Sequence, residues 1–341
     1  MINFECDYTE GAYPKILEKM MGTNMEQTVG YGVDPYCEEA KRLIQKECGG
    51  EDVTVHFLVG GTQTNTTVIA ALLRPHQGVI SADAGHIACH EAGAIEATGH
   101  KVITLESREG KIVADQIKGY YEAHYADGSR EHIVQPAMVY ISNPTEYGTL
   151  YTKQELEELS AICKKLGLLF YLDGARLGYG LTAEGYDVTI ADLAKLTDVF
   201  YIGGTKQGAL FGEAVVFAQP SHARDFRYLI KQKGGMLAKG RLLGIQFQVL
   251  FEDGAYYTLA RHGNEMAMKL KDAFIQKGYT LHMDTITNQQ FVVLDEQQLE
   301  RLSKKYLFSL WEALGNGKTV VRFCTSWATK EEHVNQLIND L

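Results

Sequence analysis

Two apolar runs of the sequence end abruptly in residues that can do chemistry. Residues 168–172 (Leu-Leu-Phe-Tyr-Leu) are followed by Asp173 and Arg176, and residues 199–202 (Val-Phe-Tyr-Ile) are followed by a glycine turn and Lys206. Lys206 comes 33 positions after Asp173, which leaves room for one crossover helix between two parallel strands. Sites of α/β proteins lie at the carboxyl edge of the sheet, so we expect these three side chains to meet there.

An aspartate, an arginine and a lysine at neighbouring strand ends suit a site for pyridoxal 5′-phosphate (PLP). The lysine can form a Schiff base, the aspartate can partner the pyridinium nitrogen, and the arginine can hold a substrate carboxylate. A lysine near an apolar pocket loses proton affinity and becomes a competent nucleophile. Two ordinary interpretations stay open: Asp173 as the N-cap of the next segment, and Lys206 as a solvated surface residue.

A second motif suits a phosphate group. Gly60, Gly61 and Thr62 follow a predicted strand and begin a predicted helix, whose free N–H groups and positive dipole end attract anions. Thr205, next to Lys206, can add another hydroxyl. The alternative is a plain strand-to-helix turn. The GxGxxG fingerprint of dinucleotide-binding proteins is absent, which argues against a nicotinamide oxidoreductase.

A histidine and a second arginine complete the set of candidates. His86 follows Gly85 at a predicted strand end, where an imidazole can stack on a flat heteroaromatic ring. Its spacing to His90 would also suit a metal pair, but the HExxH order fails, and a buried structural histidine is a further alternative. Arg322 lies in the last predicted strand, where it can grip a carboxylate or remain an exposed edge charge.

The segment 234–241 (Gly-Gly-Met-Leu-Ala-Lys-Gly-Arg) is rich in glycine and basic residues. Such a loop can reach the phosphate of a neighbouring subunit, or it can be a plain linker. The sequence leaves both interpretations open.

Composition excludes several classes of protein. The 341 residues carry a net charge of −10 with no long basic cluster, which argues against a nucleic-acid partner. No apolar run approaches the length of a membrane span, and the N-terminus lacks the blocks of a signal peptide. The six cysteines form no CxxC pair, so we expect reduced thiols, a cytoplasmic location and no metal.

Strands and helices alternate through the first 253 residues. This pattern predicts an α/β domain, residues 1–253, with a mostly parallel sheet covered by helices on both faces. Residues 254–341 are predicted as a smaller α+β domain, with strands at 279–283, 291–294 and 320–324 and helices at about 297–314 and 330–341. The first dozen residues can pack with either domain.

With these residues in place, the sequence resembles the L-threonine aldolases of low specificity. These belong to the aromatic amino acid β-eliminating lyase group of the aspartate aminotransferase superfamily (PLP fold type I). The resemblance covers nearly the whole chain, from residues 31–35 to 321–325, and 172–176 (Leu-Asp-Gly-Ala-Arg) is its most specific piece. The motifs at 60–62, 85–87 and 205–206 fall in the expected order.

The resemblance implies a role for each candidate. Lys206 would bind PLP covalently, Asp173 would contact the ring nitrogen, and His86 would stack on the ring. The carboxylate of the amino acid would be bound by two arginines. The cofactor phosphate would be bound by Gly61, Thr62 and Thr205. The two arginines are Arg176 and Arg322, and the substrate would also be bound by Cys6, which stands where serine is common.

The resemblance implies retro-aldol cleavage of L-threonine or L-allo-threonine to glycine and an aldehyde. Residues 141–147 lack the histidine and arginine usual in the family, so the base is a water, His86 or Glu146. That altered loop keeps a PLP-dependent β-eliminating lyase, racemase or aminotransferase open, and a non-catalytic protein with the same fold is a further alternative. Family members share sites between subunits, which implies a homodimer or homotetramer.

Overall fold

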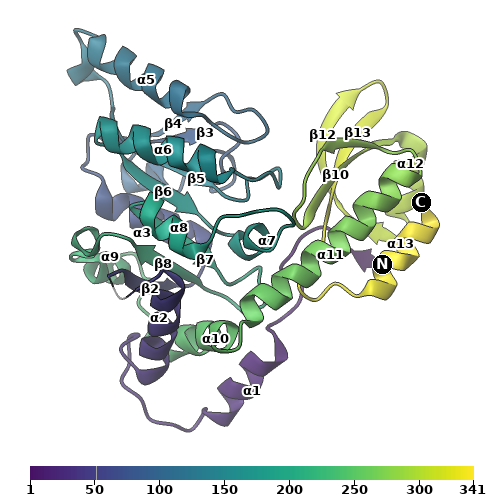
Figure 1. Ribbon diagram of the computed structural model, residues 1–341, viewed down its shortest axis with the longest axis horizontal. Helices are drawn as coiled ribbons and strands as arrows, with labels where there is room; N and C mark the ends of the chain where they lie inside the picture. The colour runs from purple at the N-terminus through teal and green to yellow at the C-terminus, as the bar shows by residue number, and fades with distance from the viewer. Residues whose placement is uncertain (51) are drawn as a thin grey trace.

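A seven-stranded sheet lies at the centre of the larger unit in the computed structural model, which describes residues 1–50 and 52–341 (Figure 1). Only β8 runs antiparallel to its neighbours, β2 and β7, whereas the other neighbouring strands are parallel. The mostly parallel sheet predicted from the sequence is therefore confirmed. In spatial order the strands are β2 (Thr54–Leu58), β8 (Glu213–Phe217), β7 (Val199–Gly203), β6 (Leu169–Asp173), β5 (Gln135–Ser142), β3 (Gln77–Ala82) and β4 (Val102–Leu105).

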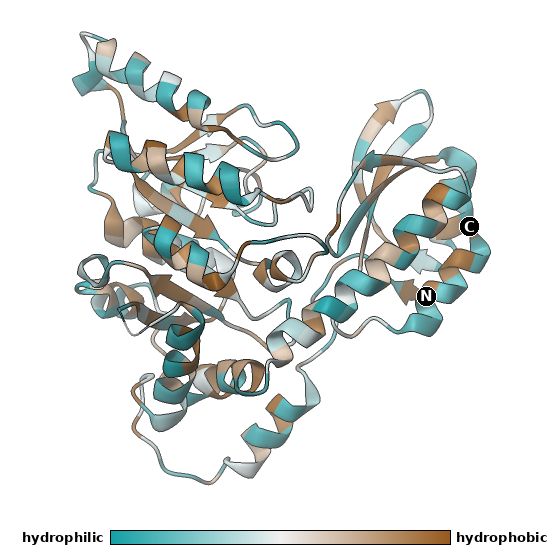
Figure 2. Cartoon of the chain, in the orientation of Figure 1, coloured by the Kyte–Doolittle hydropathy of each residue, from teal (hydrophilic) through white to brown (hydrophobic). Residues whose placement is uncertain are grey.

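Helices cover both faces of this sheet, because successive side chains of a buried strand point to opposite sides. Phe170 and Leu172 of β6 enter one apolar cluster, whereas Tyr171 enters the other. Figure 2 shows the resulting hydrophobic strands beneath helices with hydrophilic outer surfaces. The first cluster is covered by α2 (Pro35–Glu47), α5 (Ala114–Ala126), α6 (Lys153–Leu166), α8 (Ile190–Leu196) and α10 (Arg241–Glu252), and the second by α3 (Gly61–Leu72), α4 (His86–Cys89) and α9 (Phe226–Gln232).

Local capping chemistry fixes where several helices begin. Asp34 accepts a hydrogen bond from the Cys37 N–H at the start of α2, with Pro35 at the first helical position. Thr152 and Glu155 form the predicted capping box at the start of α6. The chain from Asp173 to Lys206, for which one crossover helix was expected, instead contains the short helices α7 (Leu177–Leu181) and α8.

The smaller unit is an antiparallel sheet packed on helices, and the long helix α11 (Ala255–Gln276) reaches it from the large unit (Figure 1). Its sheet order is β12 (Ser309–Gly315), β13 (Lys318–Cys324), β10 (Gln289–Asp295) and β9 (Thr280–Met283), and α12 (Glu296–Ser303) and α13 (Glu331–Asp340) complete it. We keep residues 1–253 and 254–341 as the proposed domains.

The helix predicted over 297–314 is wrong in its second half. It ends at Ser303, and residues 309–315 form β12, which pairs with β13 through a tight turn. Asn316 and Gly317 both have positive φ, 53° and 69°, as a two-residue hairpin turn requires. An Asn-Gly pair between alternating apolar residues is a strong hairpin signal, and here it outweighs helix propensity.

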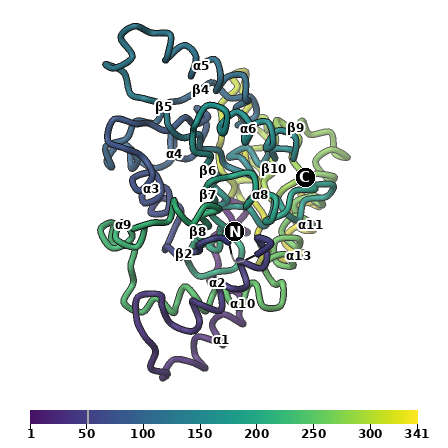
Figure 3. Tube along the Cα trace, turned by 60° about the vertical axis from the view of Figure 1, so that its left-hand side comes forward, coloured from purple at the N-terminus to yellow at the C-terminus, as the bar shows by residue number. Residues whose placement is uncertain are grey.

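The N-terminal arm belongs with the smaller unit. β1 (Ile2–Asn3) pairs in parallel with β11 (Tyr306–Leu307), and Phe4 is buried in the apolar cluster of that unit. The chain then returns to the large unit, where α1 (Pro14–Gly22) packs near α10 (Figure 3). Three 3-10 turns complete the described elements: Glu96–Thr98, Arg130–His132 and Pro220–Ala223. Among the described helices, none is both long enough and apolar enough to cross a bilayer.

Candidate active site

A cavity of about 340 Å³ opens at the carboxyl ends of β5, β6 and β7. The edge of an open α/β sheet is where such sites form, since loops from several strands converge there. The structure brings nine predicted residues together in the wall of this one cavity: Gly60, Gly61, Thr62, His86, Glu146, Asp173, Arg176, Thr205 and Lys206.

Asp173, at the end of β6, is held by donors from four different segments. Its Oδ2 accepts hydrogen bonds from the Tyr140 hydroxyl at 2.6 Å and from Asn65 Nδ2 at 3.2 Å. Its Oδ1 accepts from the Tyr201 hydroxyl and from the Ala175 N–H. Asp173 is only 3% exposed, so this arrangement fixes the direction of the carboxylate. The position of the Asp173 carboxylate is explained by these hydrogen bonds without a role as a helix N-cap.

A chain of hydrogen bonds joins Asp173 to His86 through residues that the sequence did not single out. Asn65 also donates to Glu91 Oε1 at 2.8 Å, and the same oxygen lies 2.9 Å from His86 Nδ1. The Tyr171 hydroxyl donates to Asn65 Oδ1. A carboxylate only accepts hydrogen bonds, so the proton of a neutral His86 lies on Nδ1 and leaves Nε2 as an acceptor.

Lys206 is placed by a turn that requires glycine. A Cβ on Gly203 would lie 2.4 Å from the Ala175 carbonyl oxygen, and one on Gly204 would lie 2.7 Å from that of Gly212. This close packing holds the turn against the loop after Asp173. Burial and the nearby Arg176 guanidinium both lower the pKa of Lys206, because each disfavours its charged form. A lysine with a lowered pKa is a better nucleophile.

The glycine motif lines the same cavity. α3 begins at Gly61, and the N-cap Gly60 has no side chain to occupy the free N–H groups of the first turn. A Cβ on Gly61 would lie 3.2 Å from the Tyr201 hydroxyl. Thr205 lines the cavity as well, and its hydroxyl donates to Glu213 at 2.8 Å. Glu213 lines the cavity and was not predicted.

Arg176 is held in the cavity wall by an aspartate from the N-terminal arm. Its Nε and Nη2 donate to the two carboxylate oxygens of Asp7 at 2.7 and 3.0 Å, and Asn288 Nδ2 donates to the same carboxylate at 2.9 Å. Burial acts to raise the pKa of Asp7, but the charges of Arg176 and Lys206, together with the hydrogen bonds from Arg176 and Asn288, outweigh it and lower that pKa to about 2. The Arg176 Nη1 has no hydrogen-bond partner within residues 1–50 and 52–341.

The structure does not bring two of the predicted substrate-binding residues to the cavity wall. Arg322 donates to Gln289 Oε1, to the Glu5 carbonyl and to Ser309 Oγ, and its guanidinium lies over the Trp311 ring at 5.3 Å. Cys6 is half-buried beside Tyr8, which does line the cavity. Their roles in carboxylate binding stay predictions.

Glu146 projects from the loop after β5. Its Oε1 accepts hydrogen bonds from the Ser142 hydroxyl at 2.6 Å and from the His86 N–H at 2.8 Å. Burial raises the pKa of its carboxyl group, which makes the carboxylate a stronger base. It lines the cavity together with His86.

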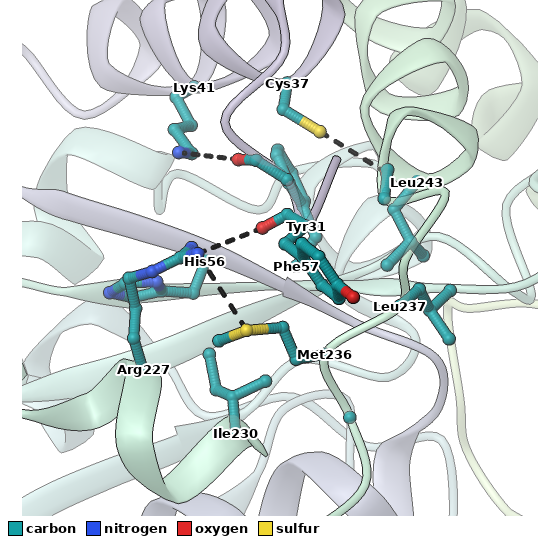
Figure 4. Close-up of a pocket in the computed structure, with 13 residues that line it drawn as sticks. Tyr31, Cys37, Lys41, His56, Phe57, Arg227, Ile230, Met236, Leu237 and Leu243 are labelled. Atoms are coloured by element: carbon teal, nitrogen blue, oxygen red, sulfur yellow. Dashed lines mark hydrogen bonds between the residues drawn. The ribbon is translucent and has the colours of Figure 1, made fainter. Parts of the chain in front are cut away.

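The glycine-rich segment 234–241 lines a different, small pocket of about 30 Å³ (Figure 4). That volume holds about one water molecule. Figure 4 shows Arg227 donating to the Tyr31 carbonyl and to Met236 Sδ. His56 lies beside Arg227, and burial lowers the pKa of this histidine to about 3. Within one protomer, then, none of the described residues of this segment lines the Lys206 cavity.

The family model described as "β-eliminating lyase" matches residues 3–297. This chain belongs to the β-eliminating lyase family. The low specificity L-threonine aldolase of a Pseudomonas species is 30% identical over 349 aligned positions, which cover 99% of this chain and 96% of the relative.

Solved structures place this family member in its fold class. A threonine aldolase of Leishmania major superimposes with a TM-score of 0.96 at 45% identity, covering 99% of this chain and 98% of the other. An aspartate aminotransferase variant of Thermus thermophilus superimposes with a TM-score of 0.71 at 14% identity. This match covers 100% of this chain and 90% of the other. The second match concerns the fold alone, and it confirms the predicted aspartate aminotransferase-like fold type I.

Proposed function

We propose that this protein is a PLP-dependent aldolase that cleaves L-threonine or L-allo-threonine to glycine and acetaldehyde. The observation that carries the proposal is the convergence of Lys206, Asp173 and His86 on one cavity. The relatives from Pseudomonas and Leishmania major are named as threonine aldolases, and both match almost the full length of the chain.

The residues of the cavity fit the cofactor. Asp173 offers a buried carboxylate fixed by four donors, which suits a protonated ring nitrogen. Lys206 supplies the amine for covalent attachment, and the free N–H groups at the start of α3 suit the phosphate. Bound PLP would supply an electron sink for the carbanion formed when the Cα–Cβ bond breaks.

The chain's own groups would position the substrate and move its protons. Arg176 Nη1, which Asp7 does not use, would bind the substrate carboxylate, with Arg322 following from the smaller unit. Glu146 would take the proton of the substrate hydroxyl, because its basicity is raised and it lies beside His86. His86 Nε2 is the alternative acceptor.

The assembly and the location are also proposals. Exposed apolar side chains gather at residues 21–33 and at Tyr228, and Tyr31 and Tyr228 line one surface hollow with Met236. An apolar surface of this kind suits a second copy of the chain, so we propose a homodimer or homotetramer. The six cysteines are free thiols, which suits the cytoplasm.

The test compares the wild-type protein with Lys206→Ala and with Lys195→Ala, an exposed lysine, each supplied with PLP. Wild type and Lys195→Ala should release acetaldehyde and glycine from L-threonine, and borohydride reduction should attach the cofactor to Lys206 in a peptide map. Lys206→Ala should lose turnover by on the order of 10³-fold or more and lose the labelled peptide. Pyruvate in place of acetaldehyde would favour β-elimination, and full activity of Lys206→Ala would refute the assignment.

A further inference from the structure

A buried carboxylate stands at the phosphate end of the cavity. Glu213 is the first residue of β8, where it pairs with Leu58 of β2 on one side and Gly203 of β7 on the other. Those two strands lead directly into the start of α3 and into the Lys206 turn. Glu213 is therefore placed between the two segments proposed to hold the phosphate, and it is only 4% exposed.

Glu213 occupies donors that would otherwise be available to the phosphate. Its Oε1 accepts from the Thr205 hydroxyl at 2.8 Å, and its Oε2 accepts from the Gly204 N–H at 3.1 Å. The Thr205 oxygen in turn accepts from the Gly212 N–H. While Thr205 donates to an ionised Glu213, its single hydroxyl proton is not available to a phosphate oxygen.

The charges around Glu213 make an ionised carboxylate and a bound phosphate incompatible neighbours. A phosphate monoester carries about −1.5 to −2 charges at pH 7 and would repel a carboxylate at close range. Lys206 is the cation that faces Glu213, but its nitrogen is used to attach the cofactor aldehyde and is then not free to pair with Glu213. The other titratable groups facing Glu213 are Asp173, Tyr171, Tyr201 and Tyr256, none of which adds positive charge.

We propose that Glu213 binds the cofactor phosphate as a neutral carboxylic acid, so that phosphate binding to the ionised form takes up one proton from solvent. The proton joins a carboxylate oxygen, and the resulting O–H donates to a phosphate oxygen; no covalent bond between heavy atoms forms or breaks. Burial raises the pKa of Glu213 to about 8 even without a phosphate, so the group already carries this proton near neutral pH, and binding takes it up from solvent only at higher pH. This inference rests on the proposed PLP function.

The first test compares two probes that differ only in the phosphate. PLP and pyridoxal share the ring and the aldehyde, which pyridoxal presents after its internal hemiacetal opens. The titration of Lys206 and Asp173 therefore affects both probes, and the opening step is the same for the wild type and for a Glu213 variant. A single linked proton predicts that the affinity for PLP falls about tenfold for each pH unit above about 8, relative to pyridoxal. Calorimetry of PLP binding at pH 8.5 in two buffers of different ionisation enthalpy should show proton uptake that pyridoxal binding lacks.

The second test removes the proton-binding group. Glu213→Gln keeps the size and offers an amide donor that needs no proton, so the difference in pH dependence between the two probes should vanish. Glu184→Gln, at an exposed position, should keep it. The same pH dependence for PLP and pyridoxal in the wild type, or an unchanged difference in Glu213→Gln, would overturn the inference.

The two proposals fail in different ways. If neither probe can be reduced onto Lys206, the PLP function itself is wrong. If both probes attach to Lys206 with one pH dependence, only the role of Glu213 is wrong. If the circular dichroism spectrum of Glu213→Gln differs from that of the wild type, the variant is misfolded. The question is then decided by the wild-type comparison of PLP with pyridoxal and by the proton uptake.

Discussion

The two ends of the candidate cavity are built in different ways. The Asp173 end is made from the large sheet, where β5, β6 and β7 and the first turns of α3 bring the tyrosines and Asn65 to one carboxylate. The arginine end is made from the N-terminal arm and the smaller unit, which supply Asp7 and Asn288 to hold Arg176.

This difference separates a rigid Asp173 end of the cavity from an arginine end that can adjust. Buried strand residues with fully hydrogen-bonded partners are held in one position, which suits a cofactor ring that stays in place. The arginine end depends on packing between two units, and relative motion is common at such interfaces. A substrate that enters and leaves would be bound at the adjustable end.

The largest expected effect is at the rigid end. Asp173→Asn would replace an acceptor of four hydrogen bonds by an amide and remove the negative charge proposed to face the ring nitrogen. We expect kcat to fall by about 10²–10³-fold, the size of losing one preorganised electrostatic partner. Asp187→Asn, on the exposed surface, is the matched control. Steady-state acetaldehyde release measures both, and a loss below about tenfold for Asp173→Asn would contradict the role.

The arginine end should respond mainly in stability and substrate affinity. Asp7→Asn would leave the buried Arg176 charge without its carboxylate, and breaking a buried pair costs about 3–5 kcal/mol. The control, Glu252→Gln, breaks the more exposed Lys19–Glu252 pair and should cost less than about 1 kcal/mol. Denaturant unfolding gives these values, and KM for L-threonine should rise in Asp7→Asn alone.

The same pair gives a pH dependence with a definite sign. The pKa of Asp7 is lowered on folding, so its contribution is complete above the unfolded value near 3.8 and is lost as the pH falls toward about 2. The acid limb of the stability curve should therefore be shallower in Asp7→Asn than in the wild type. Equal acid limbs would mean that the Arg176 pair does not hold the arm.

We expect the smallest effect on turnover for a change at Glu91, between the two ends of the cavity. Glu91→Gln would keep the size of the side chain but remove the charge that orients His86, so an amide N–H could face Nδ1 and favour the other tautomer. We expect kcat to fall by roughly tenfold to a hundredfold, as for other groups that orient a functional histidine, with a shifted pH profile. Glu96→Gln is the exposed control. An unchanged pH profile in Glu91→Gln would make Glu91 a purely structural residue.

The sequence predicted elements well where local signals agreed with one another. Asp34 with Pro35, and Thr152 with Glu155, mark helix starts that the structure confirms, because caps act over a few residues. It predicted a helix over about 297–314, but residues 309–315 form a strand, because the Asn316–Gly317 turn pairs them with the next strand.

The sequence by itself determined the family, the fold class and the carboxyl-edge motifs, because each of these resides in contiguous residues or in the order of motifs along the chain. Only the tertiary structure decided which groups surround those motifs. Asp7 and Arg176 lie 169 positions apart, and Asn65 reaches Asp173 across 108. Contacts over such separations depend on how the whole chain packs, so no local pattern could indicate Asp7 or Asn65 as part of the site.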